Sequence, residues 1–166
     1  MQREYKDMKY KILFICLGNI CRSSAAEEVM RSKIASAGLS SSVEVDSAGL
    51  IDYHEGEKSD PRMLRHAYNR DYKITHRSRP IQQEDFAYFD LIIGMDHSNI
   101  SRLKRMATSA ESMAKIHLMT EYAIKSVGDV VPDPYYGGDA GFELVLDLLE
   151  DTCEGLLNEI RRLLNT

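Results

Sequence analysis

The chain has 166 residues, of which 43% are hydrophobic and 28% charged, a balance typical of one globular domain with its own apolar core. This composition excludes disorder and collagen-like structure. The net charge is −5, so the chain lacks the general positive charge of nucleic-acid-binding proteins. No nucleic-acid partner is therefore expected. No apolar run approaches the ~18 residues of a membrane span, and no signal-peptide pattern precedes the first strand-like run.

Only three cysteines occur, Cys16, Cys21 and Cys153, and this odd, sparse set favours a reduced protein of the cytoplasm. The cysteines and the five histidines show no zinc-ligand spacing, so neither a metal nor another cofactor is expected. Cys153 falls on an apolar helical stripe, which indicates a small core residue.

The first elements follow a polar extension, residues 1–8, and open a domain predicted to span residues 9–166. Residues 10–16 form a nearly continuous apolar run, as in a strand buried on both faces. From Ser24 the apolar residues take helical spacing, and Gly38 is placed to end that helix.

The start of this helix carries a possible capping box. Ser23 or Ser24 is expected to cap it, and Glu27 stands three residues after Ser24.

Short apolar segments and helical patterns then alternate. Strands are predicted at 43–45, 91–95 and 116–119. A helix with Pro61 in its first turn is predicted to follow Asp60, and another to follow a cap at Asp96 or Ser98. Residues 128–138 are predicted as a loop, and a last helix has an apolar stripe from Phe142 to Leu163. Strands that alternate with helices favour βαβ units. The sequence therefore predicts a single α/β domain with a parallel sheet covered by helices on both faces.

The junction after the first strand carries the chemistry, because ligands of such sheets bind beyond the carboxyl ends of the strands. It reads Cys16-Leu17-Gly18-Asn19-Ile20-Cys21-Arg22-Ser23. A cysteine before a helix start faces unpaired N–H groups and the positive end of the helix dipole, which stabilise a thiolate. The five residues from Leu17 to Cys21 can wrap a loop whose N–H groups bind an oxyanion.

Two further features of this loop suit phosphate. Gly18 supplies backbone freedom, and Asn19 tolerates a left-handed conformation. The planar guanidinium of Arg22 matches two phosphate oxygens. A thiolate in a phosphate cradle predicts phosphoryl transfer through a phosphocysteine.

The segment Cys16–Ser23 closely resembles the signature loop of the low-molecular-weight protein tyrosine phosphatases. The resemblance continues in the family's order through Asp46-Ser-Ala-Gly49, Asp60-Pro-Arg-Met63, His76-Arg-Ser-Arg79, Asp85-Phe86, Phe89-Asp90, Met95-Asp96, Asn99 and Asp133-Pro-Tyr-Tyr-Gly137. It implies a flavodoxin-like, four-stranded parallel sheet in the order 2-1-3-4. One departure is visible, because Ser24 stands where the family usually has proline; this change is expected to reduce rigidity more than chemistry.

The resemblance also implies roles for the loop residues. Cys16 would attack phosphorus, Arg22 would hold the equatorial oxygens, and Ser23 would hydrogen-bond the thiolate. The loop would be fixed by Asn19, with support from Ser47 and His76.

A second motif surrounds Asp133, which has a proline on each side that stiffens the loop. By resemblance, Asp133 protonates the leaving oxygen and then deprotonates the water that hydrolyses phosphocysteine. Tyr53 and Tyr135 would wall the cleft and stack on the substrate ring, and Tyr136 would lie in a similar position.

These features predict a protein-tyrosine phosphatase that acts on tyrosine-phosphorylated proteins and small aryl phosphates and binds phosphate, sulfate or vanadate as inhibitors. Three alternatives remain open. A phosphoarginine phosphatase of the same family tends to carry threonine where Ile20 stands. A thiol-coupled arsenate reductase needs further cysteines, of which there are none between Arg22 and Cys153. A non-catalytic phosphate-binding or redox-sensing module would be expected to lack Cys16, Arg22 or Asp133.

Redox regulation is also expected, because a substrate-accessible thiolate at Cys16 is exposed to peroxide. The loop curls around an anion and could bring Cys21 within disulfide reach, which requires Cα atoms within ~7 Å. A reversible Cys16–Cys21 disulfide is predicted.

Overall fold

The computed structural model describes residues 8–135 and 137–165. Four parallel strands form one sheet in the order β2-β1-β3-β4, as predicted. They span Tyr10–Cys16 (β1), Val43–Gly49 (β2), Leu91–Gly94 (β3) and Ile116–Leu118 (β4). Strand β2 extends beyond the predicted 43–45, because the polar and small residues Asp46–Gly49 pair along β1 up to Cys16.

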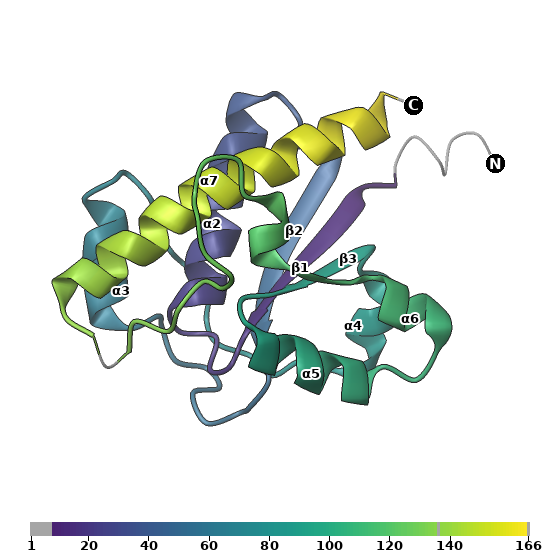
Figure 1. Ribbon diagram of the computed structural model, residues 1–166, viewed down its shortest axis with the longest axis horizontal. Coiled ribbons are helices and arrows are strands. Elements are labelled where there is room, and N and C mark those ends of the chain that lie inside the picture. Colours follow the sequence, from purple (N-terminus) through teal and green to yellow (C-terminus); the bar gives the residue numbers. More distant parts are fainter. Residues whose placement is uncertain (1–7, 136, 166) are drawn as a thin grey trace.

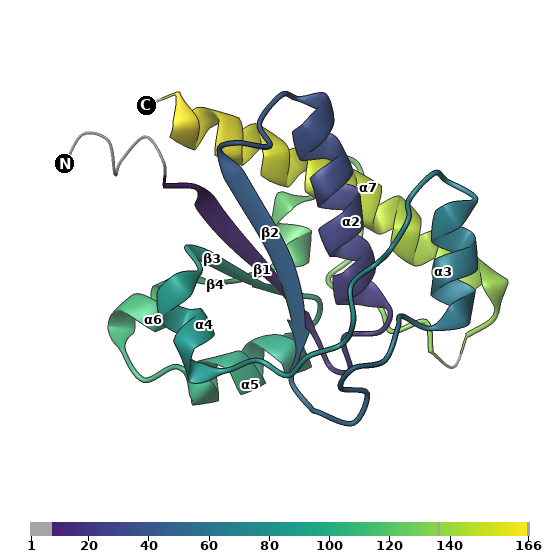
Figure 2. The ribbon, with the colours of Figure 1, turned by 180° about the vertical axis from the view of Figure 1, so that it is seen from behind.

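Helices cover both faces of the sheet, as predicted (Figures 1 and 2). One face carries α2 (Arg22–Ser36), α3 (Pro61–Tyr68) and α7 (Asp139–Leu164), and the other carries α4 (Gln83–Tyr88), α5 (His97–Met106) and α6 (Ala110–Ala114). A 3-10 helix, η1 (Met119–Tyr122), follows β4. The short elements α4, α6 and η1 were not predicted, since they are too brief to show a helical period.

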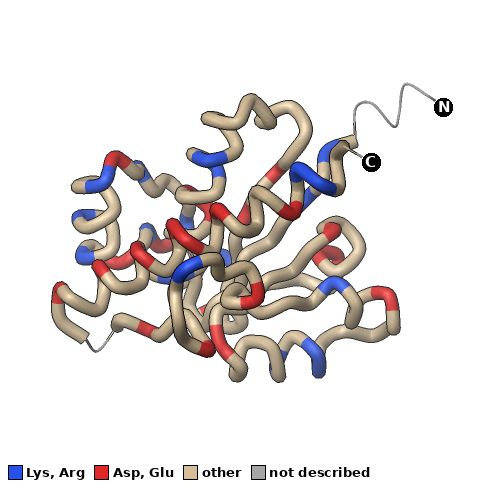
Figure 3. The backbone as a smooth tube through the Cα atoms, turned by 45° about the horizontal axis from the view of Figure 1, so that its top comes forward, with Lys and Arg blue, Asp and Glu red and all other residues tan. Residues whose placement is uncertain are grey.

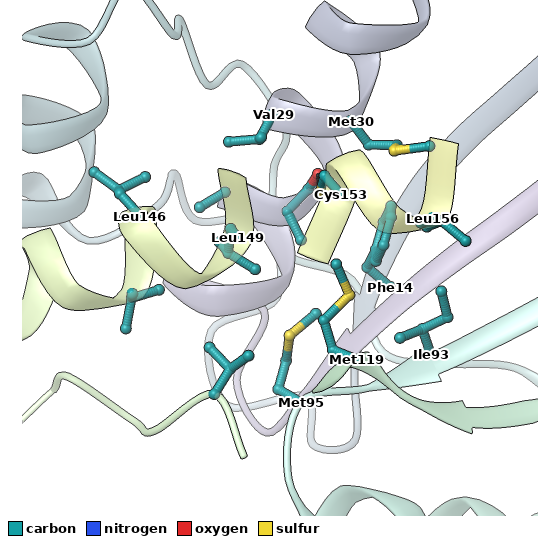
Figure 4. Packing of buried hydrophobic residues seen from close by; sticks show 14 of the residues in the cluster. Phe14, Val29, Met30, Ile93, Met95, Met119, Leu146, Leu149, Cys153 and Leu156 are labelled. Atoms are coloured by element: carbon teal, nitrogen blue, oxygen red, sulfur yellow. Dashed lines mark hydrogen bonds between the residues drawn. The ribbon is translucent and has the colours of Figure 1, made fainter. Parts of the chain in front are cut away.

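Strand β1 supplies both cores because its side chains alternate between the faces. Ile12 and Phe14 join the cluster under α2 and α7, whereas Leu13 and Ile15 join the cluster on the α4–α5 side. In Figure 4, residues of α7 such as Leu149, Cys153 and Leu156 pack over Phe14. The carboxyl end of β1, where Cys16 lies, is therefore held from both sides.

Capping side chains, a proline and a glycine mark the ends of three helices. Asp60 caps α3 by accepting a hydrogen bond from the backbone N–H of Arg62, and Pro61 lies in the first turn. Asp96 caps α5, and Gly38, with φ of 73°, follows α2. The proline in the first turn of α3, the end of α2 at Gly38 and a cap of α5 at Asp96 or Ser98 were predicted, whereas the cap by Asp60 was not.

The predicted capping box of α2 is wrong. The helix begins at Arg22 without a side-chain cap. The Ser23 hydroxyl instead contacts Cys16, and the Glu27 carboxylate binds Ser47 and Arg31. These side chains are used by neighbouring elements, which leaves the start of α2 without a side-chain acceptor, as an anion-binding helix start requires.

Helix α7 is the longest described element, and its apolar stripe is buried as far as Ile160, while Leu163 is exposed at the end. Acidic residues of α7 face basic residues in and after α3 (Figure 3). Within the described ranges, no helix combines the length and apolarity needed to cross a membrane.

Candidate active site

A cavity of about 360 Å³ lies at the carboxyl end of β1. Its floor is the segment from Cys16 to Arg22, which we call the phosphate loop, and its walls come from Ile51–His54 and the Asp133–Tyr135 segment. The structure thus brings the Cys16–Ser23 loop and the motif around Asp133 to one place. Tyr136 lies outside the described residues.

Cys16 is 3% exposed, and its Sγ lies 3.0 Å from the Ser23 hydroxyl, with which it shares a hydrogen bond. The Asn19 amide donates to Ser23 Oγ at 2.7 Å and to Ser47 Oγ at 3.1 Å. Asn19 takes the left-handed conformation, with φ of 58°, which asparagine tolerates better than most residues. Ser23 is thereby held by Asn19 with its oxygen against the sulfur.

A second layer of contacts holds Asn19 itself. Its side-chain oxygen lies 2.8 Å from His76 Nε2 and accepts from the backbone N–H of Arg79 at 3.1 Å. Ser47 Oγ donates to Glu27 Oε1 at 2.7 Å, and His76 Nδ1 lies 3.1 Å from the same oxygen. Ser47 and His76 therefore both contact Asn19, and the buried Glu27 joins them.

Gly49, at the end of β2, allows the phosphate loop to come close. A Cβ at this position would lie 2.9 Å from the carbonyl oxygen of Leu17, a distance that a side chain cannot adopt without a shift of the backbone. The next residue, Leu50, donates its N–H to that same oxygen at 2.9 Å. The glycine thus lets β2 bind the loop through backbone hydrogen bonds.

Arg22 is 3% exposed, and two acceptors orient its guanidinium: Asp96 Oδ2 at 2.6 Å and the carbonyl of Val131 at 3.1 Å. Burial by itself lowers the pKa of Arg22, but Cys16 and Asp96 raise it more, and the net direction is upward. The guanidinium therefore stays charged at the cavity. Asp133 Oδ2 lies 3.8 Å from its Nη2.

Asp133 lies across the cavity and remains 45% exposed at its side chain. Its Oδ1 accepts the N–H of Tyr135 at 3.0 Å. The segment is anchored upstream, where the N–H of Val131 donates to the carbonyl of Met95 at 2.9 Å. The carboxylate is accessible to a bound substrate and has a defined position above the loop.

The two tyrosines of the cavity wall differ in exposure. Tyr135 is 39% exposed and Tyr53 80%, so Tyr53 forms the outer rim. The Tyr53 ring meets the ring of His54 edge to face, with centroids 4.8 Å apart. His54 packs so closely on the loop that a Cβ on Gly18 would lie 3.1 Å from its ring.

The chain is similar to known proteins over nearly its whole length. The sequence profile described as low molecular weight phosphotyrosine protein phosphatase matches residues 11–165. The chain belongs to this family.

Individual relatives agree with that result. A low molecular weight protein-tyrosine-phosphatase of Streptomyces coelicolor is 42% identical over 156 residues, which cover 93% of this chain and 95% of that protein. A crystal structure of a protein tyrosine phosphatase from Entamoeba histolytica superposes with a TM-score of 0.91 at 42% identity, covering 93% and 98% of the two chains. An arginine phosphatase of Drosophila superposes with a TM-score of 0.84 at 31% identity, covering 92% and 98%.

The three cysteines of this phosphatase are free thiols in different surroundings. Burial, followed by the Asp60 charge, raises the pKa of Cys21, and burial raises that of Cys153 in the α2–α7 core. Both thiols are therefore protonated at neutral pH. Cys16 alone of the three has the Ser23 hydroxyl on its sulfur.

Ser24, at the usual proline position of the family, is fully buried, and its hydroxyl accepts from Ser59 Oγ at 2.7 Å. It also donates to the carbonyl of Cys21 at 3.4 Å. The hydrogen bond from Ser59 links the first turn of α2 to the segment before α3, and the bond to Cys21 stays within the start of α2.

Glu27, Asp46 and His76 place three potential ligand atoms within 4.8 Å of one another, the one such group found in the described ranges. Arg31 pairs with Glu27 at 2.5 Å, and Arg79 pairs with Asp46 at 3.0 Å. The carboxylates are thus already neutralised by arginines, and the group serves to support the phosphate loop.

Sequence reasoning overlooked several residues of the phosphatase site. Asp96 was expected only as a helix cap, yet it also binds Arg22, and Glu27 was expected only in a capping box. His54, to which the sequence analysis gave no role in the site, lines the cavity and pairs with Glu57 at 2.5 Å. Its position directly after Tyr53 was the available signal.

Proposed function

We propose that this chain hydrolyses phosphotyrosine in proteins, as well as small aryl phosphates, through a phosphocysteine on Cys16. One observation carries the proposal. The Cys16 sulfur, the charged Arg22 guanidinium and the Asp133 carboxylate face the same cavity. They are the nucleophile, the anion-binding group and the acid that the reaction requires.

In the first step, the Cys16 thiolate attacks phosphorus, an S–P bond forms and the P–O bond to the phenol breaks. Arg22 and the backbone N–H groups of the phosphate loop bind the non-bridging oxygens, where negative charge is held in the transition state. Asp133 gives its proton to the departing phenolate oxygen, whose ordinary pKa is about 10. Tyrosine leaves as a neutral phenol.

In the second step, Asp133 takes a proton from water, the water oxygen attacks phosphorus and the S–P bond breaks. Inorganic phosphate is released and the Cys16 thiolate is restored. The Ser23 hydroxyl, 3.0 Å from Sγ, stabilises the sulfur as it leaves with negative charge. No metal or other cofactor is required.

The walls of the cavity favour a planar ring. Ile20, Tyr53 and Tyr135 line it and would place phosphate at the end of an aromatic side chain, whereas a short serine stem would not reach the loop. Free phosphate, sulfate and vanadate would occupy the same cradle and inhibit. We place the reaction in the cytoplasm, because Cys16 must stay reduced to attack phosphorus.

Phosphoarginine is the second candidate substrate, favoured by the structural similarity to the Drosophila arginine phosphatase. Ile20 argues against it, since an apolar side chain offers no hydrogen bond to a guanidinium. Arsenate reduction is disfavoured because Cys153 is buried in the α7 core, away from the cavity.

One substrate panel tests the proposal. Initial rates on matched phosphotyrosine, phosphoserine and phosphoarginine peptides, and on arsenate with thiol, are measured in chelator. We expect strong preference for phosphotyrosine, and we expect Cys16→Ser to lose turnover while still binding phosphate by calorimetry. Faster hydrolysis of phosphoarginine would show that phosphoarginine is the preferred substrate. Retained activity in Cys16→Ser would show that Cys16 is not the nucleophile.

A further inference from the structure

Arg62, in the first turn of α3, connects that helix to the loop that carries Asp133. Its Nη2 donates to the carbonyl oxygen of Tyr135 at 2.9 Å. The same guanidinium binds the Asp60 carboxylate through two nitrogens, Nε at 3.1 Å and Nη2 at 3.0 Å. The planar guanidinium presents two nitrogens to Asp60 while it also reaches Tyr135, a fixed geometry that the point charge of a lysine ammonium does not reproduce.

Asp60 is in turn joined to the phosphate loop. Its backbone N–H donates to the carbonyl of Ile20 at 2.8 Å. Burial by itself raises the pKa of Asp60, but the hydrogen bonds from Arg62 lower it more, so the carboxylate is ionised at neutral pH. A backbone hydrogen bond therefore joins Ile20 to Asp60, and an ion pair joins Asp60 to Arg62.

The flat face of Arg62 also lies on aromatic rings. Its guanidinium carbon is 5.5 Å from the ring centroid of Tyr135 and 4.8 Å from that of Phe142. Phe142 is fully buried in α7, so it provides a fixed support. Since the N–H of Tyr135 donates to Asp133 Oδ1 at 3.0 Å, the contacts of Arg62 end at the proposed general acid.

We infer that Arg62 is a positioning residue, which holds the Asp133–Tyr135 segment at a set distance from the phosphate loop, so that Asp133 meets the leaving oxygen. The inference rests on the proposed function, in which Asp133 is the acid. Misplacing a catalytic group by about 1 Å can cost up to ~10²-fold in rate. The loss should fall on the step that needs the proton.

The test measures kcat/KM for aryl phosphates whose leaving groups span a range of pKa. This parameter reports the steps up to departure of the phenol. For Arg62→Ala we expect about a tenfold loss with poor leaving groups, a part of the ~10²–10⁴-fold contribution of a general acid, and a smaller loss as the leaving-group pKa falls. Arg62→Lys should show the same trend at reduced size.

Arg65→Ala is the matched control, since Arg65 lies one turn along α3 and pairs with Asp139 at 3.1 Å instead. It should leave the profile unchanged. Thermal unfolding of each variant checks the fold, and Arg62→Lys still decides the question if Arg62→Ala does not fold.

Two results would overturn the inference. One is an equal loss for all leaving groups in both Arg62 variants. The other is a full additional loss when Arg62→Ala is combined with Asp133→Asn, because residues that act through one group are not additive. If Asp133→Asn alone leaves the profile flat, the proposed acid is wrong, and the role of Arg62 falls with it.

Discussion

At the residue scale, the two cysteines of the phosphate loop have different chemistry. Cys16 has a hydroxyl on its sulfur and faces the cavity. Cys21 has its pKa raised, by burial first and by Asp60 second, and so remains a thiol at neutral pH. The same short loop therefore contains a nucleophile and a protonated neighbour that does not compete for phosphorus.

Peroxide should link these two sulfurs. The Cys16 thiolate is oxidised to a sulfenic acid, and Cys21 then attacks that sulfur, releasing water and forming a disulfide. Because the raised pKa keeps Cys21 protonated, its thiolate fraction grows with pH, and closure should accelerate by about tenfold per pH unit through the neutral range. Mass spectrometry of the linked peptide after peroxide at several pH values measures this rate.

Control variants distinguish a protective role of Cys21 from a role in packing alone. Dithiothreitol should restore activity to the oxidised wild type but not to oxidised Cys21→Ser. Cys153→Ser should behave as wild type, since Cys153 is buried in α7. Complete recovery of Cys21→Ser would show that Cys21 serves packing only.

At the element scale, residues 123–135, which follow η1, hold the proposed general acid without a helix or strand. Backbone contacts hold its middle, where Val131 donates to Met95 and accepts from Arg22. Prolines flank Asp133 and restrict the backbone there. A short stretch of loop thus acquires the rigidity that general acid catalysis needs.

Asp133→Asn should lower turnover by about 10²–10⁴-fold, the usual contribution of a general acid and base. Asparagine keeps the size of the side chain but cannot give up a proton. The loss in kcat/KM should grow with the pKa of the leaving phenol. Asp129→Asn, an exposed residue of the same segment paired with His97, is the control and should leave the rates unchanged.

At the scale of the whole molecule, ion pairs join α7 to the region of α3. Glu143 binds Arg70 and His66, and Asp139 binds Arg65 and His66. The Arg70 hydrogen bond lowers the pKa of Glu143, and the His66 hydrogen bond lowers that of Asp139. These contacts lie beside the residues that support Arg62.

Acid should weaken this connection. A carboxylate whose pKa is lower in the folded state stabilises the fold above its unfolded pKa of about 4, and that stability is lost as the pH falls through the folded value. The free energy of unfolding should therefore decrease from about pH 5 to pH 3. Glu143→Gln should flatten this decrease by less than ~1 kcal/mol, because the Glu143 carboxylate is 44% exposed and solvent screens its ion pairs. Parallel urea-unfolding profiles for wild type and variant would contradict it.

Local patterns in the sequence determined the fold class, the order of the main elements and the phosphate loop. The apolar run of β1, the helical spacing after it and the intervening Cys16–Arg22 segment are encoded by neighbouring residues. So are the caps at Asp60 and Asp96. Such features follow from propensity, periodicity and the chemistry of a helix start, which do not depend on distant parts of the chain.

Only the tertiary structure decided the partners of these residues. Asp96 reaches Arg22 from another strand end, Glu27 supports Asn19 through Ser47 instead of capping its helix, and Arg62 reaches Tyr135 from the first turn of α3. Each pair joins separate elements that come together only when the helices and loops pack around the sheet. A side chain forms a hydrogen bond with the partner that folding places beside it, and the spacing of residues along the sequence does not predict that contact.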